Sequence, residues 1–248
     1  RQPGSALKPF TYAAAFDPNS SAPFTAATML LDVETPFVTR RQESYTPANY
    51  ARVEHGPVSA REALASSLNI PAVEVLDHVG INSMVQLATD AGMRTLAENP
   101  ALDLAVTLGG GEVRLLDLVQ AYTIFANAGR RATPVYLLEV RSAQGDILFR
   151  QPPAVPGPQI IDERVAFLIT DILSDDSARV MGFGRNSVLN IGRPAAAKTG
   201  TTTDTRDNWI VGYTPNLITG VWVGNADNAA MAGVSGISGA GPIWNSYM

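Results

Sequence analysis

The residues best suited to chemistry near the start of the chain are a serine and a lysine. Ser5 follows Gly4 and Lys8 comes three residues later, so on a helix both side chains face the same side. At a helix N-terminus the backbone dipole favours developing negative charge, and a serine needs a neighbouring base to attack a carbonyl. A lysine whose pKa is lowered by burial or by a second cation can be that base. The alternative is a helix-capping serine with a solvated lysine.

A second candidate group is Lys198-Thr199-Gly200, which follows the run of alanines at 195–197 inside a predicted strand. A glycine within a strand often marks close approach by a ligand or by another backbone. Lysine and threonine beside it would hold a carboxylate through a charge and a hydroxyl group. The alternative is an edge strand whose lysine discourages aggregation.

Lysine usage distinguishes these two positions from the rest of the chain. Of 18 lysine and arginine residues, only Lys8 and Lys198 are lysines. Arginine stays protonated, whereas lysine can lose its proton when it is buried or close to another cation. Base composition or a hot habitat could favour arginine, but neither explains where the two lysines stand. They indicate sites where a guanidinium group would not serve.

A third element, Ser67-Leu68-Asn69, lies between the two lysines, where one helical segment ends and Pro71 starts the next. Taken alone, it is explained equally well as ordinary capping of a helix end. Its weight comes from the order of the three elements along the chain: Ser-x-x-Lys, then Ser-x-Asn, then Lys-Thr-Gly.

Composition excludes several classes of protein. With 248 residues, 46% hydrophobic and 17% charged, the chain is neither disordered nor collagen-like. A net charge of -5 without a basic run argues against binding to nucleic acid or to an anionic membrane surface. Without cysteine and with two histidines, the chain is not expected to hold a cysteine-based zinc site or a multi-histidine metal centre. No apolar run is long enough to span a membrane.

Apolar spacing and turn residues predict an α+β fold with helices first and a sheet last. A capping box at Ser59 and Glu62 opens one of the predicted helices. The stretch 18–55, rich in Pro, Thr, Ser and Asn, is predicted to be a long surface excursion. The predicted helices span residues 5–17, 59–69, 72–78, 83–91, 114–127 and 162–173.

The sheet is predicted from three strands at 195–202, 207–213 and 217–225. Their links, Asp204-Thr205-Arg206 and Pro215-Asn216, are short, so successive strands should pair antiparallel. A separate hairpin is predicted from 135–141 and 145–150, and the uncharged tail 228–248 is predicted to form strands and turns.

With its three motifs in this order, the chain resembles the penicillin-binding proteins and serine β-lactamases. The residues around the motifs are similar to those of bifunctional, class A penicillin-binding proteins, and the resemblance covers nearly the whole chain. The similar segments are 1–10, 63–73, 108–129, 198–202 and Asp207-Asn208-Trp209. The resemblance implies a transpeptidase domain over 1–248: an antiparallel sheet packed with helices, plus a helical subdomain. It also implies truncation at the N-terminus, with upstream strands and a glycosyltransferase domain absent.

The resemblance further implies a role for each motif residue. Ser5 would be the acyl-accepting nucleophile and Lys8 its base. Ser67 would relay the proton toward the leaving group, Asn69 would fix Lys8 and the substrate amide, and Lys198 would keep the site cationic.

The Lys-Thr-Gly-Thr segment would bind the substrate in such a site. Thr199 and Thr201 would hold the terminal carboxylate of a peptide, or the equivalent group of a β-lactam, with Gly200 between them. The backbone N–H groups of Ser5 and Thr201 would form the oxyanion hole.

The activity implied is D,D-transpeptidation of peptidoglycan stem peptides ending in D-Ala-D-Ala, with acylation and inhibition by β-lactams. The resemblance implies no metal and no organic cofactor for this reaction. Leu68 stands where class A β-lactamases have Asp, and no Glu-x-x-Leu-Asn follows, so the glutamate that positions a deacylating water is missing. Two alternatives remain: a D,D-carboxypeptidase or endopeptidase that uses water as acceptor, and a non-catalytic domain that senses β-lactams or acts as a scaffold.

The family also implies a location and a missing neighbour. Such a domain works outside the cytoplasm, in the periplasm or at the cell surface, anchored to the plasma membrane through residues absent here. Its sheet has five strands, two of them upstream of the nucleophile helix. Without these, the apolar edge at 217–225 is expected to be covered by another chain or by a swapped segment.

Overall fold

The computed structural model describes residues 1–202 and 205–248 and confirms the α+β class. Its sheet contains β7 (Ala196–Thr201), β8 (Asp207–Thr214) and β9 (Leu217–Gly224), antiparallel and in that order. Every residue of the central strand β8 is buried, whereas β9 is half-buried along its length. Among the described residues β9 pairs only with β8, so it is an edge strand. The turn predicted at Asp204-Thr205-Arg206 begins outside the described residues.

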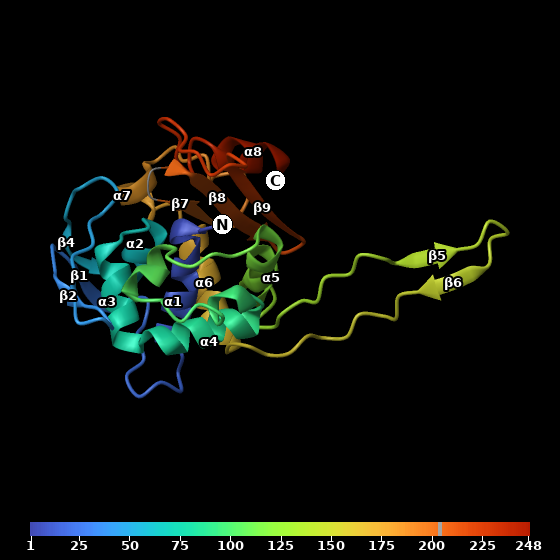
Figure 1. Cartoon of the computed structure of the whole chain (residues 1–248), viewed down its shortest axis with the longest axis horizontal. Helices are drawn as coiled ribbons and strands as arrows, with labels where there is room; N and C mark the ends of the chain where they lie inside the picture. The colour runs from blue at the N-terminus through green and yellow to red at the C-terminus, as the bar shows by residue number, and fades with distance from the viewer. Residues whose placement is uncertain (203–204) are drawn as a thin grey trace.

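The segment that carries Ser5 and Lys8 begins as a tighter helix than predicted. A 3-10 turn, η1 (Gly4–Leu7), leads into α1 (Lys8–Ala15), which has Pro9 in its first turn. Phe10 packs against Tyr122 and Phe125 with ring centroids 5.5 and 5.1 Å apart. These contacts fix α1 in the centre of the molecule (Figure 1).

Most of the remaining helices lie around α1 (Figure 1). The capping box at Ser59 and Glu62 is confirmed, but its helix ends earlier than the predicted Asn69. The Thr170 hydroxyl in the helix at 163–174 donates to Phe125 O at 3.1 Å, which ties this helix to the one at 115–126. The helices are α2 (Ala60–Ala65), α3 (Ile70–Val79), α4 (Ile81–Ala91), η2 (Arg94–Leu96), η3 (Leu104–Leu108), α5 (Leu115–Ala126) and α6 (Glu163–Ser174).

The segment 18–55 is mostly exposed or half-buried, as predicted for a surface excursion, but it also contains short strands and a few buried residues. Its first strand, β1 (Met29–Asp32), pairs with β4 (Gly56–Ser59), and a second small pair joins β2 (Phe37–Val38) to β3 (Ser44–Tyr45). Asp32 ends β1 fully buried. Asp32 and Asn49, two polar residues of this segment, are buried and hydrogen-bond each other, which the polar composition of the segment did not predict.

The prediction of strands and turns for the tail is also wrong, because it contains α8 (Ala240–Tyr247). Trp244 of this helix is fully buried against β8, and a Cβ at Gly212 would lie 2.3 Å from its ring. A glycine at that position therefore gives the indole ring its space. A short helix, α7 (Val180–Phe183), was not predicted either.

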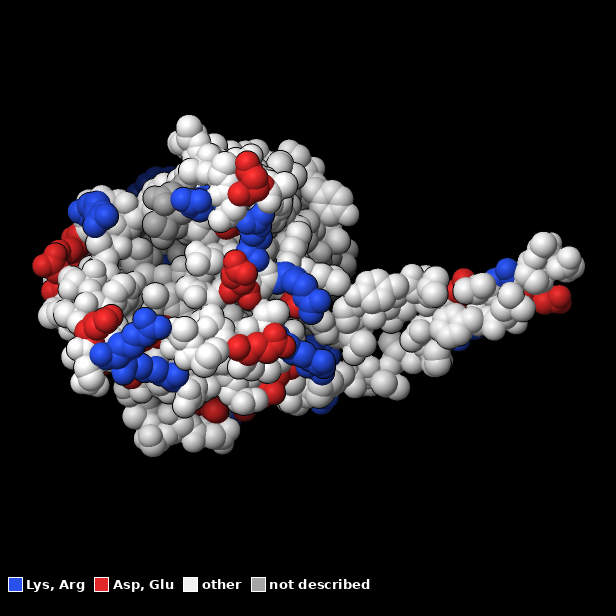
Figure 2. Space-filling view, viewed as in Figure 1, with Lys and Arg blue, Asp and Glu red and all other residues white. Residues whose placement is uncertain are grey.

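The predicted hairpin is present as β5 (Glu139–Arg141) and β6 (Ile147–Arg150), and it extends far from the rest of the molecule (Figure 1). Arg130 and Gln159 form a bridge at its base. Figure 2 shows acidic and basic side chains interspersed on the face turned to the viewer. In the described parts of the chain, no helix is both long and apolar enough to cross a membrane.

Candidate active site

Ser5 is placed by contacts of backbone against backbone. A Cβ at Gly4 would lie 2.6 Å from Thr201 O, and one at Gly200 would lie 2.0 Å from Pro3 O. On the other side, a Cβ at Gly109 would lie 2.2 Å from the Gly4 nitrogen. Real side chains do not fit at such distances. The three glycines therefore let the segment before Ser5 lie directly between η3 and β7.

Lys8 is fully buried, and its ammonium group contacts the Ser67–Asn69 turn. Lys8 Nζ donates to Ser67 O at 2.5 Å, to Leu68 O at 2.9 Å and to Asn69 Oδ1 at 2.7 Å. Burial lowers the pKa of Lys8 well below its ordinary value, and the positive charge of Lys198 lowers it further. The carboxylate of Asp32 acts in the opposite direction on this pKa. Lys8 is thus a lysine that can lose its proton.

The Ser67 hydroxyl lies between the two lysines of the chain. Ser67 Oγ is 2.7 Å from Lys198 Nζ and 3.4 Å from Lys8 Nζ. Burial lowers the pKa of Lys198 to about 7, with a further contribution from the charge of Arg179. Ser67 itself has a φ of 62°, which belongs to the left-handed region and turns its side chain toward the lysines. This arrangement can pass a proton from one amine to the other through the hydroxyl group.

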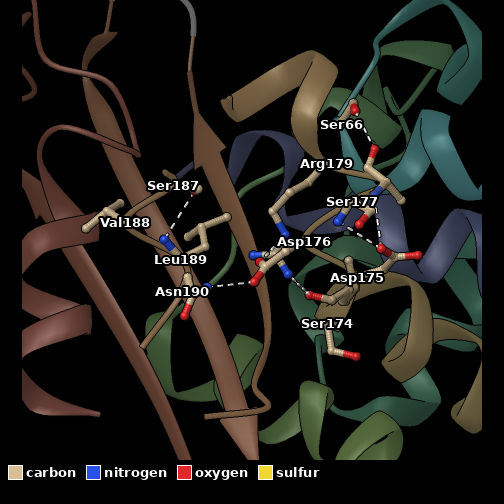
Figure 3. A network of polar contacts seen from close by, with 12 residues as sticks. Ser66, Ser174, Asp175, Asp176, Ser177, Arg179, Ser187, Val188, Leu189 and Asn190 are labelled. Atoms are coloured by element: carbon tan, nitrogen blue, oxygen red, sulfur yellow. Dashed lines mark hydrogen bonds and ion pairs between the residues drawn. The ribbon is translucent and has the colours of Figure 1, made fainter. Parts of the chain in front are cut away.

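A polar network behind the Ser67 turn supports it from the side of α6 and β7 (Figure 3). Ser66 Oγ donates to Ala178 O at 2.9 Å. The buried guanidinium group of Arg179 donates to Leu173 O at 2.6 Å and lies 3.4 Å from Asp176 Oδ1. Sequence reasoning did not single out Arg179, because nothing in its spacing shows that this arginine, among sixteen, is buried beside Lys198.

The substrate-binding candidates of β7 lie beside Ser5. Thr199 and Gly200 are buried and Thr201 is half-buried. Thr201 Oγ1 accepts a hydrogen bond from the Gly236 N–H at 2.9 Å, so the loop before α8 covers this end of the strand. Among the described residues, the Ser5 hydroxyl has no hydrogen-bond partner and remains free to approach a bound carbonyl.

The structure thus brings all the candidate residues into one connected group. The contacts run from Ser5 through its neighbour Gly4 to β7, and from Lys8 through the Ser67–Asn69 turn to Lys198. The residues joined in this way are Ser5, Lys8, Ser67, Asn69, Lys198, Thr199, Gly200 and Thr201. In the described part of the chain, no cluster of His, Cys, Asp or Glu could hold a metal ion.

In the segment predicted as a surface excursion, sequence reasoning missed Asn49, which contacts the site, and Asp32, which binds Asn49. Asn49 Oδ1 accepts from the Asn69 N–H at 2.8 Å, and Asn49 Nδ2 donates to Asp32 Oδ1 at 2.7 Å. The partners are 20 and 17 residues apart in sequence, so no local spacing reveals them.

Comparison with known proteins identifies the family. The sequence model described as "Penicillin binding protein transpeptidase domain" matches residues 1–248. The chain belongs to the penicillin-binding protein transpeptidase family. The resemblance to the class A members is confirmed by relatives such as penicillin-binding protein 1A of Neisseria lactamica, which is 33% identical over 260 residues. Penicillin-binding protein 2D of Bacillus subtilis is 32% identical over 256 residues.

Solved structures of penicillin-binding proteins have the same fold. Penicillin-binding protein 1A from Haemophilus influenzae superposes with a TM-score of 0.87 at 25% identity, covering 100% of this chain and 42% of that one. PonA1 from Mycobacterium tuberculosis gives 0.83 at 26% identity, covering 99% and 68%. The two curated relatives named above are matched over 100% of this chain but only 31% and 35% of their own length, so the chain spans about a third of such proteins.

Proposed function

We propose that this domain is a serine D,D-transpeptidase that cross-links peptidoglycan stem peptides through an acyl-enzyme at Ser5. The observation that carries the proposal is the Ser67 hydroxyl, placed between two buried amines whose pKa values are both lowered. Membership of the transpeptidase family supports acyl transfer as the reaction class. The Gly4–Thr201 contact supports Ser5 as the nucleophile, since Gly4, the residue before it, lies against β7, the strand proposed to bind the substrate carboxylate.

Acylation starts from neutral Lys8. A neutral amine has two N–H groups and a lone pair, so Lys8 can donate to two oxygens of the turn and take the proton of Ser5. Ser5 Oγ then attacks the carbonyl of the penultimate D-Ala, and the backbone N–H groups of Ser5 and Thr201 stabilise the oxyanion. The C–N bond breaks, and the departing D-Ala receives its proton through Ser67. An amine of a neighbouring strand then attacks the ester carbonyl, and the bond between its carbon and Ser5 Oγ breaks as the new amide forms. The proton lost by the amine returns to Ser5 Oγ through Lys8.

β-Lactams are proposed to acylate the same serine. PonA1 of Mycobacterium tuberculosis, 25% identical to this chain, has been solved in complex with penicillin V. Labelling with a fluorescent penicillin, followed by peptide mapping, tests the proposal directly and should place the label on Ser5. Product analysis with and without an amine acceptor then separates transpeptidation from hydrolysis. A folded chain that takes up no label would favour a non-catalytic role.

Thr199→Val is expected to lower acylation by carboxylate-bearing β-lactams about ten- to a hundredfold. A hydrogen bond to a charged group contributes roughly 1.5–3 kcal/mol, and valine removes the donor while keeping the shape. Thr201 is less suitable for this test, because its hydroxyl also accepts from Gly236. The measurement is the second-order acylation rate for paired ligands with and without the carboxylate.

The matched control is Thr219→Val, in the edge strand of the same sheet. The Thr219 hydroxyl is buried without a hydrogen-bond partner among the described residues, so its removal should leave acylation unchanged. Equal losses in Thr199→Val for ligands with and without a carboxylate would show that Thr199 does not bind that group.

We also propose that the domain acts outside the cytoplasm as one part of a longer membrane-anchored protein that includes a glycosyltransferase domain. The support is the share of the relatives that the chain covers, 31% of penicillin-binding protein 1A from Neisseria lactamica. The domain assignment over 1–248 rests on the match of the family sequence model to the same residues.

The free edge of β9 is proposed to pair with a strand from upstream of Arg1 in a longer protein. Apolar side chains line this edge, including Leu217, Ile218 and Val221, and unpaired edges of this kind associate. The 248-residue chain is therefore expected to self-associate, whereas a chain extended upstream should be monomeric. Light scattering measures the difference. A monomeric 248-residue chain whose β9 amides exchange rapidly while Ser5 is fully acylated would contradict the pairing.

A further inference from the structure

Asp32 is a fully buried carboxylate outside the motifs of the active site. Asn49 Nδ2 donates to both of its oxygens, at 2.7 and 2.9 Å. The backbone N–H of His55 donates to Asp32 Oδ2 at 3.0 Å, and His55 Nδ1 lies 2.6 Å from the same oxygen. A buried carboxylate with this many partners is held in a single orientation, and it fixes the orientation of Asn49 and His55 as well.

Asn49 connects Asp32 to the active site through hydrogen bonds. Its Nδ2 group is bound to Asp32 and to Val53 O at 2.8 Å, so its Oδ1 atom must point the other way. There it accepts from the Asn69 N–H at 2.8 Å. The neighbouring Ala48 O accepts from Asn69 Nδ2, also at 2.8 Å. The backbone and the side chain of Asn69 are thus both fixed by residues 48–49.

Asn69 completes the path to the proposed base. With Nδ2 bound to Ala48 O, its Oδ1 is directed at Lys8 Nζ, 2.7 Å away. Hydrogen bonds therefore connect Asp32 to Lys8 through Asn49 and Asn69 without a gap. No step of this path is shared with the Arg179 network, which contacts the turn at Ser66 (Figure 3).

We propose that Asp32 is a positioning residue for acylation, acting through Asn49 to aim Asn69 at Lys8 and acting on Lys8 through its negative charge. The inference rests on the function proposed above, in which Lys8 is the base for Ser5. The merely structural alternative is that Asp32 only ties the segment around His55 to β1 and leaves Lys8 unaffected.

The charges around this path decide whether loss of Asp32 raises or lowers the pKa of Lys8. The positive charge of Lys198, on β7, lowers the pKa of Lys8, whereas the negative charge of Asp32, on β1, raises it. The titratable groups that interact with Asp32 are His55, Lys8 and the Tyr12 phenol of α1. Glu74 of α3 also raises the pKa of Tyr12. Asp32 stabilises protonated Lys8, so its loss makes deprotonation of Lys8 easier and moves the titration of Lys8 to lower pH.

The experiment uses the fact that Lys8 and Lys198 are the two lysines of the chain. Labelling lysine with 13C at Cε gives two side-chain signals, assigned by comparison with Lys198→Met, and each is titrated directly by NMR. In Asp32→Asn the Lys8 signal is expected to titrate at a lower pH than in the unaltered chain. An unmoved Lys8 titration would overturn the proposed action of Asp32.

Glu74→Gln is the matched control. Glu74 accepts from the Leu31 N–H at 3.0 Å, next to Asp32 on β1, and its charge, like that of Asp32, raises the pKa of Tyr12. In the described part of the chain, Glu74 forms no hydrogen bond or ion pair with the residues that join Asp32 to Lys8. The control therefore removes one carboxylate from the same region, and it should leave the Lys8 titration where it was. An equal shift in Glu74→Gln would show a general charge effect and overturn the specific role of Asp32.

Kinetics provide the second readout. Acylation of Asp32→Asn by penicillin should fall about tenfold or more at neutral pH, with the acid limb of its pH profile moved to lower pH. Asn49→Ser keeps the charge of Asp32 but breaks the hydrogen-bonded path, so its acylation rate should fall while the acid limb of its pH profile stays in place.

If Asp32→Asn does not fold, an unchanged acylation rate in Asn49→Ser overturns the positioning role. If the unaltered chain is not acylated, the proposed function fails, and the lysine titration still decides the effect of Asp32.

Discussion

Ser5→Ala is expected to abolish acylation by penicillin, and Lys8→Arg should be nearly as damaging although it keeps the positive charge. Arginine can still donate to the oxygens of the Ser67–Asn69 turn that now bind Lys8 Nζ. It stays protonated at neutral pH and cannot accept the proton of Ser5. The measurement is the second-order rate of labelling by a fluorescent penicillin, with thermal unfolding as a check that each variant folds.

Lys8→Met separates the two roles that Lys8 could have. If Lys8 is the base, the Arg and Met variants should be about equally inactive, since neither can take a proton. If Lys8 only anchors the turn and attracts the substrate, the Arg variant should retain most of the rate and the Met variant should not. That second result would remove the proton-transfer step from the proposed mechanism.

Gly109→Ala is expected to eliminate acylation or prevent folding. The φ of Gly109 is +97°, and an added Cβ would lie 2.2 Å from the nitrogen and 2.3 Å from the Cα of Gly4. Both are backbone atoms, and Gly4 is held on its other side by Thr201. The methyl group can be accommodated only by moving the residue next to Ser5. Acylation rate and melting temperature measure the effect.

Gly145→Ala measures the loss of stability that comes from the positive φ alone, without a clash. Gly145 has nearly the same φ, +95°, but nothing lies within 4 Å of its added Cβ. It should therefore lose only the roughly 1–2 kcal/mol of a side chain in the left-handed region and keep full acylation. Similar behaviour of the two variants would mean that the Gly4–Gly109 contact does not control the placement of Ser5.

The candidate site could be predicted from the sequence because its chemistry depends on short spacings. Ser5 and Lys8 lie one helical turn apart, and Lys198, Thr199 and Gly200 are consecutive in a strand. The α+β class and most helices followed from local patterns of the same kind, such as the capping box that opens α2.

What could not be predicted depends on contacts between distant segments. Asp32 and Asn49 belong to a stretch whose polar composition indicates a surface, and their burial follows from partners that only the fold supplies. The helix α8 was missed because its Gly, Pro, Asn and Ser residues favour turns, whereas burial of Trp244 against Gly212 stabilises the helix. In both cases tertiary contacts outweigh local preference.

The hairpin arm of β5 and β6 has a consequence for how such domains can diverge. Its two ends lie together: Arg131 N–H donates to Pro158 O at 3.1 Å, and Ile160 N–H donates to Gly129 O at 2.8 Å. The intervening residues extend away from the rest of the molecule (Figure 1). Since the cost of closing a loop grows slowly with its length, the arm can be lengthened, shortened or replaced by a tight turn at little cost. Selection can therefore reshape this arm for new contacts without altering the chemistry at Ser5.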